Sequence, residues 1–155
     1  MKCEESDSKT HLDSSTSGVG LAETQCASIV LAPVATNLAV ARSFVSAALE
    51  KWECEDTDDV AALLTSEIVS NAVRHAASAV GLEVAIIDQQ HLRVEARDEA
   101  PKATVATDPD RSGGEGGLGL QIVQSLALRW GVDRYDDHKV VWFESTVRPR
   151  RPNLV

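Results

Sequence analysis

Apolar side chains recur along this chain with two different spacings, which separate predicted helices from predicted strands. Residues 33–49 carry an apolar side chain every three or four positions, and Pro33 suits the first turn of a helix. A second helical pattern extends to about residue 78, with Asp56 and Thr57 as capping residues and Gly81 as its stop signal. Residues 118–130 have the same spacing, and we expect this third helix to end at Gly131.

Alternating or β-branched runs predict four strands, at residues 26–31, 82–87, 92–97 and 139–146. The second and third are separated by four polar residues, which favours an antiparallel hairpin. Residues 99–117 contain two prolines and many glycines, so a long loop is expected there.

The predicted order is β-α-α-β-β-loop-α-β, in which helices and strands do not strictly alternate. A doubly wound parallel sheet therefore fits poorly. We expect an α+β fold, a two-layer α/β sandwich with the helices on one face of a mixed, mainly antiparallel sheet.

Composition favours one domain, because 155 residues with 43% hydrophobic content can bury a core of their own. Residues 1–24 are acidic and rich in serine, which is typical of a disordered tail, and residues 148–155 form a basic Pro/Arg tail. The domain itself is expected at residues 25–147. A net charge of −9 opposes direct binding to nucleic acid.

No apolar run approaches the roughly 20 residues that span a bilayer, and the acidic N-terminus does not resemble a signal peptide. Cys3, Cys26 and Cys54 lack the paired spacing of a zinc site or a disulfide framework, so we expect free thiols in a reducing compartment. The predicted location is the cytoplasm, without a membrane partner.

A polar trio lies along the second predicted helix. Glu67, Asn71 and His75 are spaced four residues apart, which places them on one edge. Leu64, Ile68 and the following small residues occupy the adjoining arc, so the trio would lie at the rim of the core. There an amide oxygen can ligate Mg²⁺ and a carboxylate can accept a proton, although an ordinary amphipathic helix gives the same pattern.

Five of the nine glycines fall between Gly113 and Gly119, directly before the third predicted helix. Glycines allow backbone amides to approach an anion, and a helix N-terminus adds a positive dipole end. The chain has no Gly-Lys-Ser/Thr sequence, which excludes the ordinary P-loop. A flexible loop remains the simpler interpretation of the glycines alone. Asp98, at the end of a predicted strand, can accept a hydrogen bond from an adenine amino group, or it can be an ordinary turn residue.

In this order, the three segments resemble the boxes of the Bergerat-fold (GHKL, histidine kinase-like) ATPases, over about residues 26–147. Glu67, Asn71 and His75 look like the N box, and Asp98 like the adenine-reading aspartate. The Asn-Ala-Val-Arg-His sequence and the later Gly-Leu-Gly-Leu are similar to anti-sigma-factor serine/threonine kinases. The resemblance implies that the nucleotide is bound by Asn71, His75, Asp98, Gly114, Gly116, Gly117, Leu118, Gly119 and Leu120.

The resemblance further implies ATP and Mg²⁺ as cofactors, with Asn71 as the metal ligand and Glu67 as the catalytic residue. The expected function is to sequester a sigma factor and to phosphorylate a serine or threonine of an anti-sigma-factor antagonist. This antagonist would be of the sulfate-transporter/anti-sigma-antagonist (STAS) type. Both proteins would be partners in transcription regulation, and the kinase can form a homodimer.

One departure keeps alternatives open. The usual Gly-x-Gly after the aspartate is replaced by Glu99-Ala100-Pro101, and proline is stiff where glycine is pliant. A catalytically inactive, partner-switching binding module of the same fold, with weak or no ATP binding, is therefore the second hypothesis. The catalytic half of a histidine kinase fits less well, because no helical hairpin with a phosphoacceptor histidine is present in these residues. A scaffold that binds no nucleotide is the remaining alternative.

Overall fold

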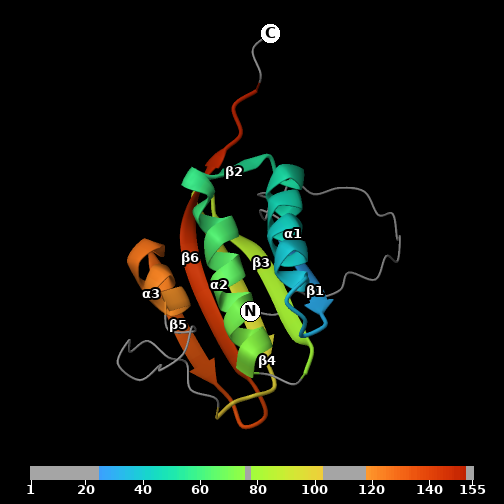
Figure 1. Ribbon diagram of the computed structural model, residues 1–155. Helices are drawn as coiled ribbons and strands as arrows, with labels where there is room; N and C mark the ends of the chain where they lie inside the picture. The colour runs from blue at the N-terminus through green and yellow to red at the C-terminus, as the bar shows by residue number, and fades with distance from the viewer. Residues whose placement is uncertain (1–24, 76–77, 103–117, 153–155) are drawn as a thin grey trace, which may run out of the picture.

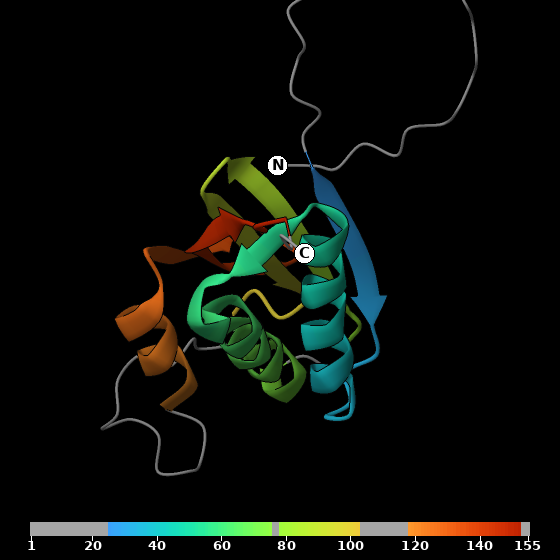
Figure 2. The ribbon, with the colours of Figure 1, turned by 90° about the horizontal axis from the view of Figure 1, so that it is seen from above.

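The computed structural model describes residues 25–75, 78–102 and 118–152, so the predicted tail at residues 1–24 lies outside the described residues. Helices α1 (Asn37–Lys51), α2 (Val60–His75) and α3 (Leu118–Leu126) lie in one layer against a sheet (Figure 1). Seen from above in Figure 2, α1 and α2 lie side by side on one face of that sheet. This arrangement confirms the predicted α+β two-layer fold.

Six strands are described: β1 (Cys26–Leu31), β2 (Cys54–Asp56), β3 (Val80–Asp88), β4 (His91–Asp98), β5 (Arg129–Arg134) and β6 (Lys139–Pro149). Their order across the sheet is β1-β3-β4-β6-β2, and β5 also pairs with β6. Within the described ranges all pairings are antiparallel. The predicted strand at 26–31 and the hairpin are confirmed, and Gly81 lies within β3 instead of ending a helix.

Side-chain alternation along the strands separates a buried face from a face without helices. In β4 the side chains of Leu92, Val94 and Ala96 are buried beneath the helices, while Arg93 and Glu95 point to the other face. The core consists of this buried set packed on the apolar sides of α1 and α2.

The third predicted helix is too long. Helix α3 ends at Leu126, and the Leu128 amide donates to the Glu144 carbonyl at 2.9 Å, which starts the pairing of β5 with β6. Gly131 is therefore a strand residue and not a helix stop. A Cβ at Gly131 would lie 2.7 Å from the ring of Trp142, so this glycine provides room for the indole on the neighbouring strand.

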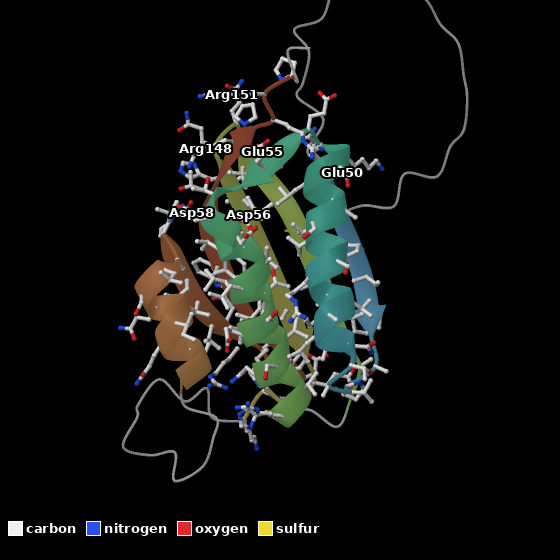
Figure 3. All side chains as sticks on the ribbon, turned by 45° about the horizontal axis from the view of Figure 1, so that its top comes forward. Glu50, Glu55, Asp56, Asp58, Arg148 and Arg151 are labelled. Atoms are coloured by element: carbon white, nitrogen blue, oxygen red, sulfur yellow. The ribbon has the colours of Figure 1, made fainter. Side chains whose placement is uncertain are left out.

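A cluster of charged side chains surrounds the start of α2 (Figure 3). Asp56 accepts hydrogen bonds from the amides of Ala61 and Ala62 at 2.8 and 2.9 Å, so it caps the helix as predicted. Thr57, the other predicted cap, has a buried hydroxyl without a hydrogen-bond partner in the described part of the chain. The short strand β2, which was not predicted, pairs with the end of β6 there.

Two further observations concern the cysteines and the helices. Cys26 is disulfide-bonded, so the prediction of three free thiols is wrong for that residue, whereas Cys54 is free. Among the described helices, none is both long enough and apolar enough to cross a membrane.

Candidate functional site

Helix α2 presents its polar trio at the edge of the core. Leu64, Ile68 and Ala72 are buried and face the sheet. Glu67 and Asn71, one turn apart, are half-buried at the rim, while His75 in the last turn is exposed. The structure therefore brings Glu67 and Asn71 together at a protected boundary and leaves His75 in solvent.

Asn71 has a polar atom that its surroundings do not satisfy. Its side-chain oxygen, Oδ1, is buried and has no hydrogen-bond partner among the described residues. A buried polar atom without a partner costs free energy of about 1–3 kcal/mol, so such atoms require a reason. An oxygen that awaits a ligand is one such reason, and amide oxygens are suitable ligands for Mg²⁺.

Glu67 lies against the beginning of α3. A Cβ at Gly119 would collide with the carboxylate of Glu67, so a larger residue there would have to push the flexible end of the Glu67 side chain aside. The next residue, Leu120, is buried in the core cluster and fixes the start of α3 beside α2. The structure thus brings Glu67, Gly119 and Leu120 together at the junction of α2 and α3.

The glycine-rich segment itself is only partly described. Gly114, Gly116 and Gly117, the predicted phosphate-binding glycines, lie outside the described residues. Leu118 is the first residue of α3. The N-terminus of this helix, where a phosphate would gain from the helix dipole, therefore lies directly beside Glu67.

Asp98 is the last residue of β4, and it is completely buried in an ion pair. Its Oδ2 lies 3.0 Å from Lys139 Nζ, and both side chains are fully shielded from solvent. The Lys139 ammonium donates to Asp98 Oδ1 at 3.2 Å and to the Ala100 carbonyl at 3.3 Å. Although Oδ2 is close enough for the ion pair, it receives no hydrogen bond of acceptable direction within the described chain.

Lys139 was missed by the sequence analysis. It is the first residue of β6 and pairs in register with Asp98. A signal was present, because the alternation of Lys139 with Val141 and Phe143 places all three on the buried face of β6.

The strand registers place these groups at one end of the sheet. Asp98 and Lys139 are opposite each other, and Arg97 pairs with Gly81 near the beginning of β3. Strand β3 begins five residues after α2 ends at His75, so the C-terminal end of α2 lies at the same end of the sheet. Asn71, His75 and Asp98 therefore share one end of the molecule, which Figure 1 shows below the centre.

A hollow of about 540 Å³, lined by Glu83, Arg97, Tyr135 and His138 among others, lies toward the face without helices and includes none of the predicted residues. Residues 103–117, which contain most of the predicted phosphate-binding glycines, are outside the described ranges. In the described ranges, no three acidic, His or Cys side chains form a metal cluster.

The comparison with protein families decides the classification. Residues 31–144 match the histidine kinase-like ATPase domain. The chain belongs to this family. No curated protein matches the chain. This family assignment accounts for the α+β fold, and proteins of this family generally use a nucleotide together with Mg²⁺.

A solved structure agrees with this fold. The crystal structure of the RsbU and RsbW domains of Rv1364c from Mycobacterium tuberculosis matches with a TM-score of 0.60 and 16% identity, over 81% of this chain. This chain spans 34% of the length of that protein. The mycobacterial sensor histidine kinase MprB matches with a TM-score of 0.46 and 20% identity, over 61% of this chain and 76% of that one.

The residues of this ATPase domain fit the group that the family implies. The unpartnered Oδ1 of Asn71 is available to a magnesium ion, and Mg²⁺ commonly takes few protein ligands because phosphate oxygens and water complete its shell. Asp98 Oδ2 is ion-paired with Lys139 but receives no hydrogen bond within the described residues, so it can accept one from a donor such as an adenine amino group. Asn71 and Asp98 are two of the residues that were predicted to bind the nucleotide.

Proposed function

We propose that this protein is an ATP-binding regulator of the anti-sigma-factor type, which sequesters a sigma factor and phosphorylates a serine or threonine of an antagonist protein. The observation that carries the proposal is the buried, unpartnered oxygen of Asn71, one helical turn from Glu67. This pair supplies a metal ligand and a proton acceptor on the same edge of α2.

Each residue has a role in this proposal. Asn71 would hold Mg²⁺, which when bound neutralises charge on the phosphates. Glu67 would accept the proton of the attacking hydroxyl at its carboxylate, which lies against Gly119. The N-terminus of α3 would orient a phosphate through its backbone amides, which no side chain at position 119 obstructs.

The partners are inferred from the resemblance and from charge. The fold match to a protein that contains an RsbW domain supports the anti-sigma-factor type over other families of this fold. A net charge of −9 favours a basic surface on the sigma factor or the antagonist, because complementary charge steers association. We further propose that the protein acts in the cytoplasm and can form a homodimer, as the resemblance implies.

A second function has its own supporting observation. Asp98 is already paired with Lys139, and Pro101 replaces a glycine of the motif, so base binding would have to compete with an internal ion pair. An inactive module that switches partners without phosphoryl transfer fits this feature. The two functions differ in whether Glu67 has a chemical role.

The test is phosphoryl transfer from γ-labelled ATP to a panel of purified antagonist proteins of the sulfate-transporter/anti-sigma-antagonist (STAS) type. We expect wild-type protein to label one antagonist at a serine or threonine, and Glu67→Gln to bind the same antagonist without labelling it. The Gln variant is a matched control because it keeps the shape and loses only the proton acceptor. Binding without labelling by the wild type would support the inactive module and exclude the kinase.

A further inference from the structure

The buried Asp98–Lys139 pair presents two kinds of hydrogen-bonding group at one point. Asp98 Oδ2 is a buried acceptor without a hydrogen-bond donor in the described residues. Beside it, at 3.0 Å, is the Lys139 ammonium, which is a donor only. A carboxylate by itself offers only hydrogen-bond acceptors, so Lys139 changes which hydrogen-bonding groups the site can bind.

The two purine bases differ at the position that such a site reads. Adenine carries an amino group, a donor, on the ring carbon where guanine carries a carbonyl oxygen, an acceptor. A lone carboxylate accepts a bond from the amino group and repels the carbonyl oxygen. A carboxylate with an ammonium beside it can serve either base, because the ammonium donates to the carbonyl oxygen.

The hydrogen bonds of Lys139 indicate which contact a guanine base would replace. The ammonium donates to Asp98 Oδ1 and to the Ala100 carbonyl at 3.3 Å. The Ala100 amide in turn donates to Asp98 Oδ1 at 2.8 Å, so the turn after β4 covers the pair with its own backbone. A guanine carbonyl oxygen would take the place of the Ala100 carbonyl as an acceptor for the ammonium.

We propose that Lys139 is a specificity-determining residue of the nucleotide site, and that it lets the site accept guanine nucleotides as well as adenine nucleotides. This proposal rests on the proposed function, because it concerns the base of the nucleotide that the same site binds. It assigns to Lys139 a role that the three sequence boxes do not contain.

The test measures the ratio of the dissociation constants of Mg²⁺-GTP and Mg²⁺-ATP, by displacement of a fluorescent trinitrophenyl-ATP probe. The wild-type ratio is expected to lie within about tenfold of unity, whereas a site that reads adenine alone rejects the wrong base far more strongly. In Lys139→Met, which removes the donor and keeps an apolar stem, we expect the ratio to rise at least about tenfold through loss of GTP affinity.

Two control variants distinguish a change in base specificity from a general loss of nucleotide binding. Lys139→Gln keeps a donor, so its ratio should stay near that of the wild type. Arg129→Met removes a cation from Glu144 on the other face of the sheet and should leave the ratio unchanged. If Lys139→Met fails to fold, the wild-type ratio still tests the proposal, because a value above about a hundredfold would overturn it without any variant.

The outcomes distinguish this proposal from the function on which it rests. ATP binding with a wild-type ratio above about a hundredfold, or a ratio unaltered in Lys139→Met, would overturn the role of Lys139 and leave the ATP site standing. Displacement of the probe by neither nucleotide would overturn both.

Discussion

Asp98 and Glu144 are both buried carboxylates of the central sheet, yet they are neutralised in different ways. Glu144, on the face without helices, receives Arg129 at 2.6 Å and Arg93 at 3.2 Å, one arginine on each oxygen. Asp98, beneath the helices, has a single lysine, and one of its oxygens lacks a hydrogen bond within the described residues. We infer that both oxygens of Glu144 are satisfied within the protein, whereas Asp98 can still accept a hydrogen bond from a ligand.

The contacts of Arg93 support the interpretation that the face of the sheet without helices, the open face, carries a structural network. The Arg93 guanidinium lies over the ring of Trp142, 3.9 Å from the centroid, and its Nε donates to Glu95 at 2.6 Å. Arg93 and Glu144 each have more than one partner, so the group holds β4, β5 and β6 in register. On the buried side the atoms without a hydrogen-bond partner in the described residues include those of Asn71, Asp98 and Ser145, whereas the face without helices has one such atom, Trp142 Nε1.

The largest expected effect is on the Asp98 pair. Lys139→Met leaves a fully buried carboxylate without its cation, which should lower the free energy of unfolding by about 3–5 kcal/mol. Arg129→Met is the matched change on the other face. Because the Arg129 side chain is 73% exposed and Glu144 keeps Arg93, its cost should stay below about 1 kcal/mol.

Urea unfolding followed by circular dichroism measures both variants. The double variant Asp98→Asn/Lys139→Met should recover most of the lost stability, since it leaves no unpaired charge. Equal costs for Lys139→Met and Arg129→Met would contradict the contrast between the two carboxylates.

The next effect concerns the packing of the open face. In Gly131→Ala the new methyl group would lie 2.7 Å from the Trp142 ring, so overpacking should cost about 1–3 kcal/mol of stability. Gly81→Ala is the control on β3, where the nearest atom is the Cβ of Arg97 at an ordinary 3.7 Å. Thermal unfolding should separate the two variants, while both should keep their affinity for nucleotide. A neutral Gly131→Ala would show that the indole moves freely.

Asp56 provides a third carboxylate for the comparison, half-buried and satisfied by two backbone amides. Burial is the main cause that raises its pKa above the ordinary 3.8, against those hydrogen bonds. The folded protein therefore binds this proton more tightly than the unfolded chain, and stability falls as pH rises from 3.8 through the raised pKa.

Asp56→Asn keeps a capping oxygen and lacks this titration. Relative to the variant, wild-type protein should lose less than about 1 kcal/mol as the pH rises through that window. Urea unfolding at closely spaced pH values from 3.5 upward measures the difference. A wild type that gains stability over the variant across the same range would contradict the cause given for the pKa.

The smallest effect on stability is expected at the junction of α2 and α3, where the effect on function is large. Gly119→Ala gains up to about 1 kcal/mol of helix propensity, and the flexible end of Glu67 can move aside, so stability should change by less than about 1 kcal/mol. The displaced carboxylate should lower the rate of phosphoryl transfer at least about tenfold. An unchanged rate would show that Glu67 does not need its present position.

The sequence predicted elements whose apolar spacing is uniform. The strand at 26–31 and the hairpin were found because alternation there is unbroken. Strand β5 was taken for helix because helical spacing continues past Leu126, and only its pairing with β6 reveals the strand. Strand β2 has three residues, too few for a periodic signal.

The residues of the candidate site also differ in whether the sequence alone could predict them. Glu67 and Asn71 could be found because a spacing of four within one helix is a local property. The partnership of Asp98 with Lys139 could not, because it depends on the register between two strands separated by 41 positions along the chain. Local spacing thus identified Glu67 and Asn71, and tertiary pairing determined the state of Asp98.

The most direct test of the account is a calorimetric titration of the protein with Mg²⁺-ATP, in parallel with Asn71→Ala. The account predicts saturable binding by the wild type and its loss in the variant, which should remain as stable as the wild type because it removes a buried unpartnered oxygen. No binding at millimolar ATP, or the same affinity in Asn71→Ala, would contradict the claim that this orphaned oxygen marks a nucleotide site.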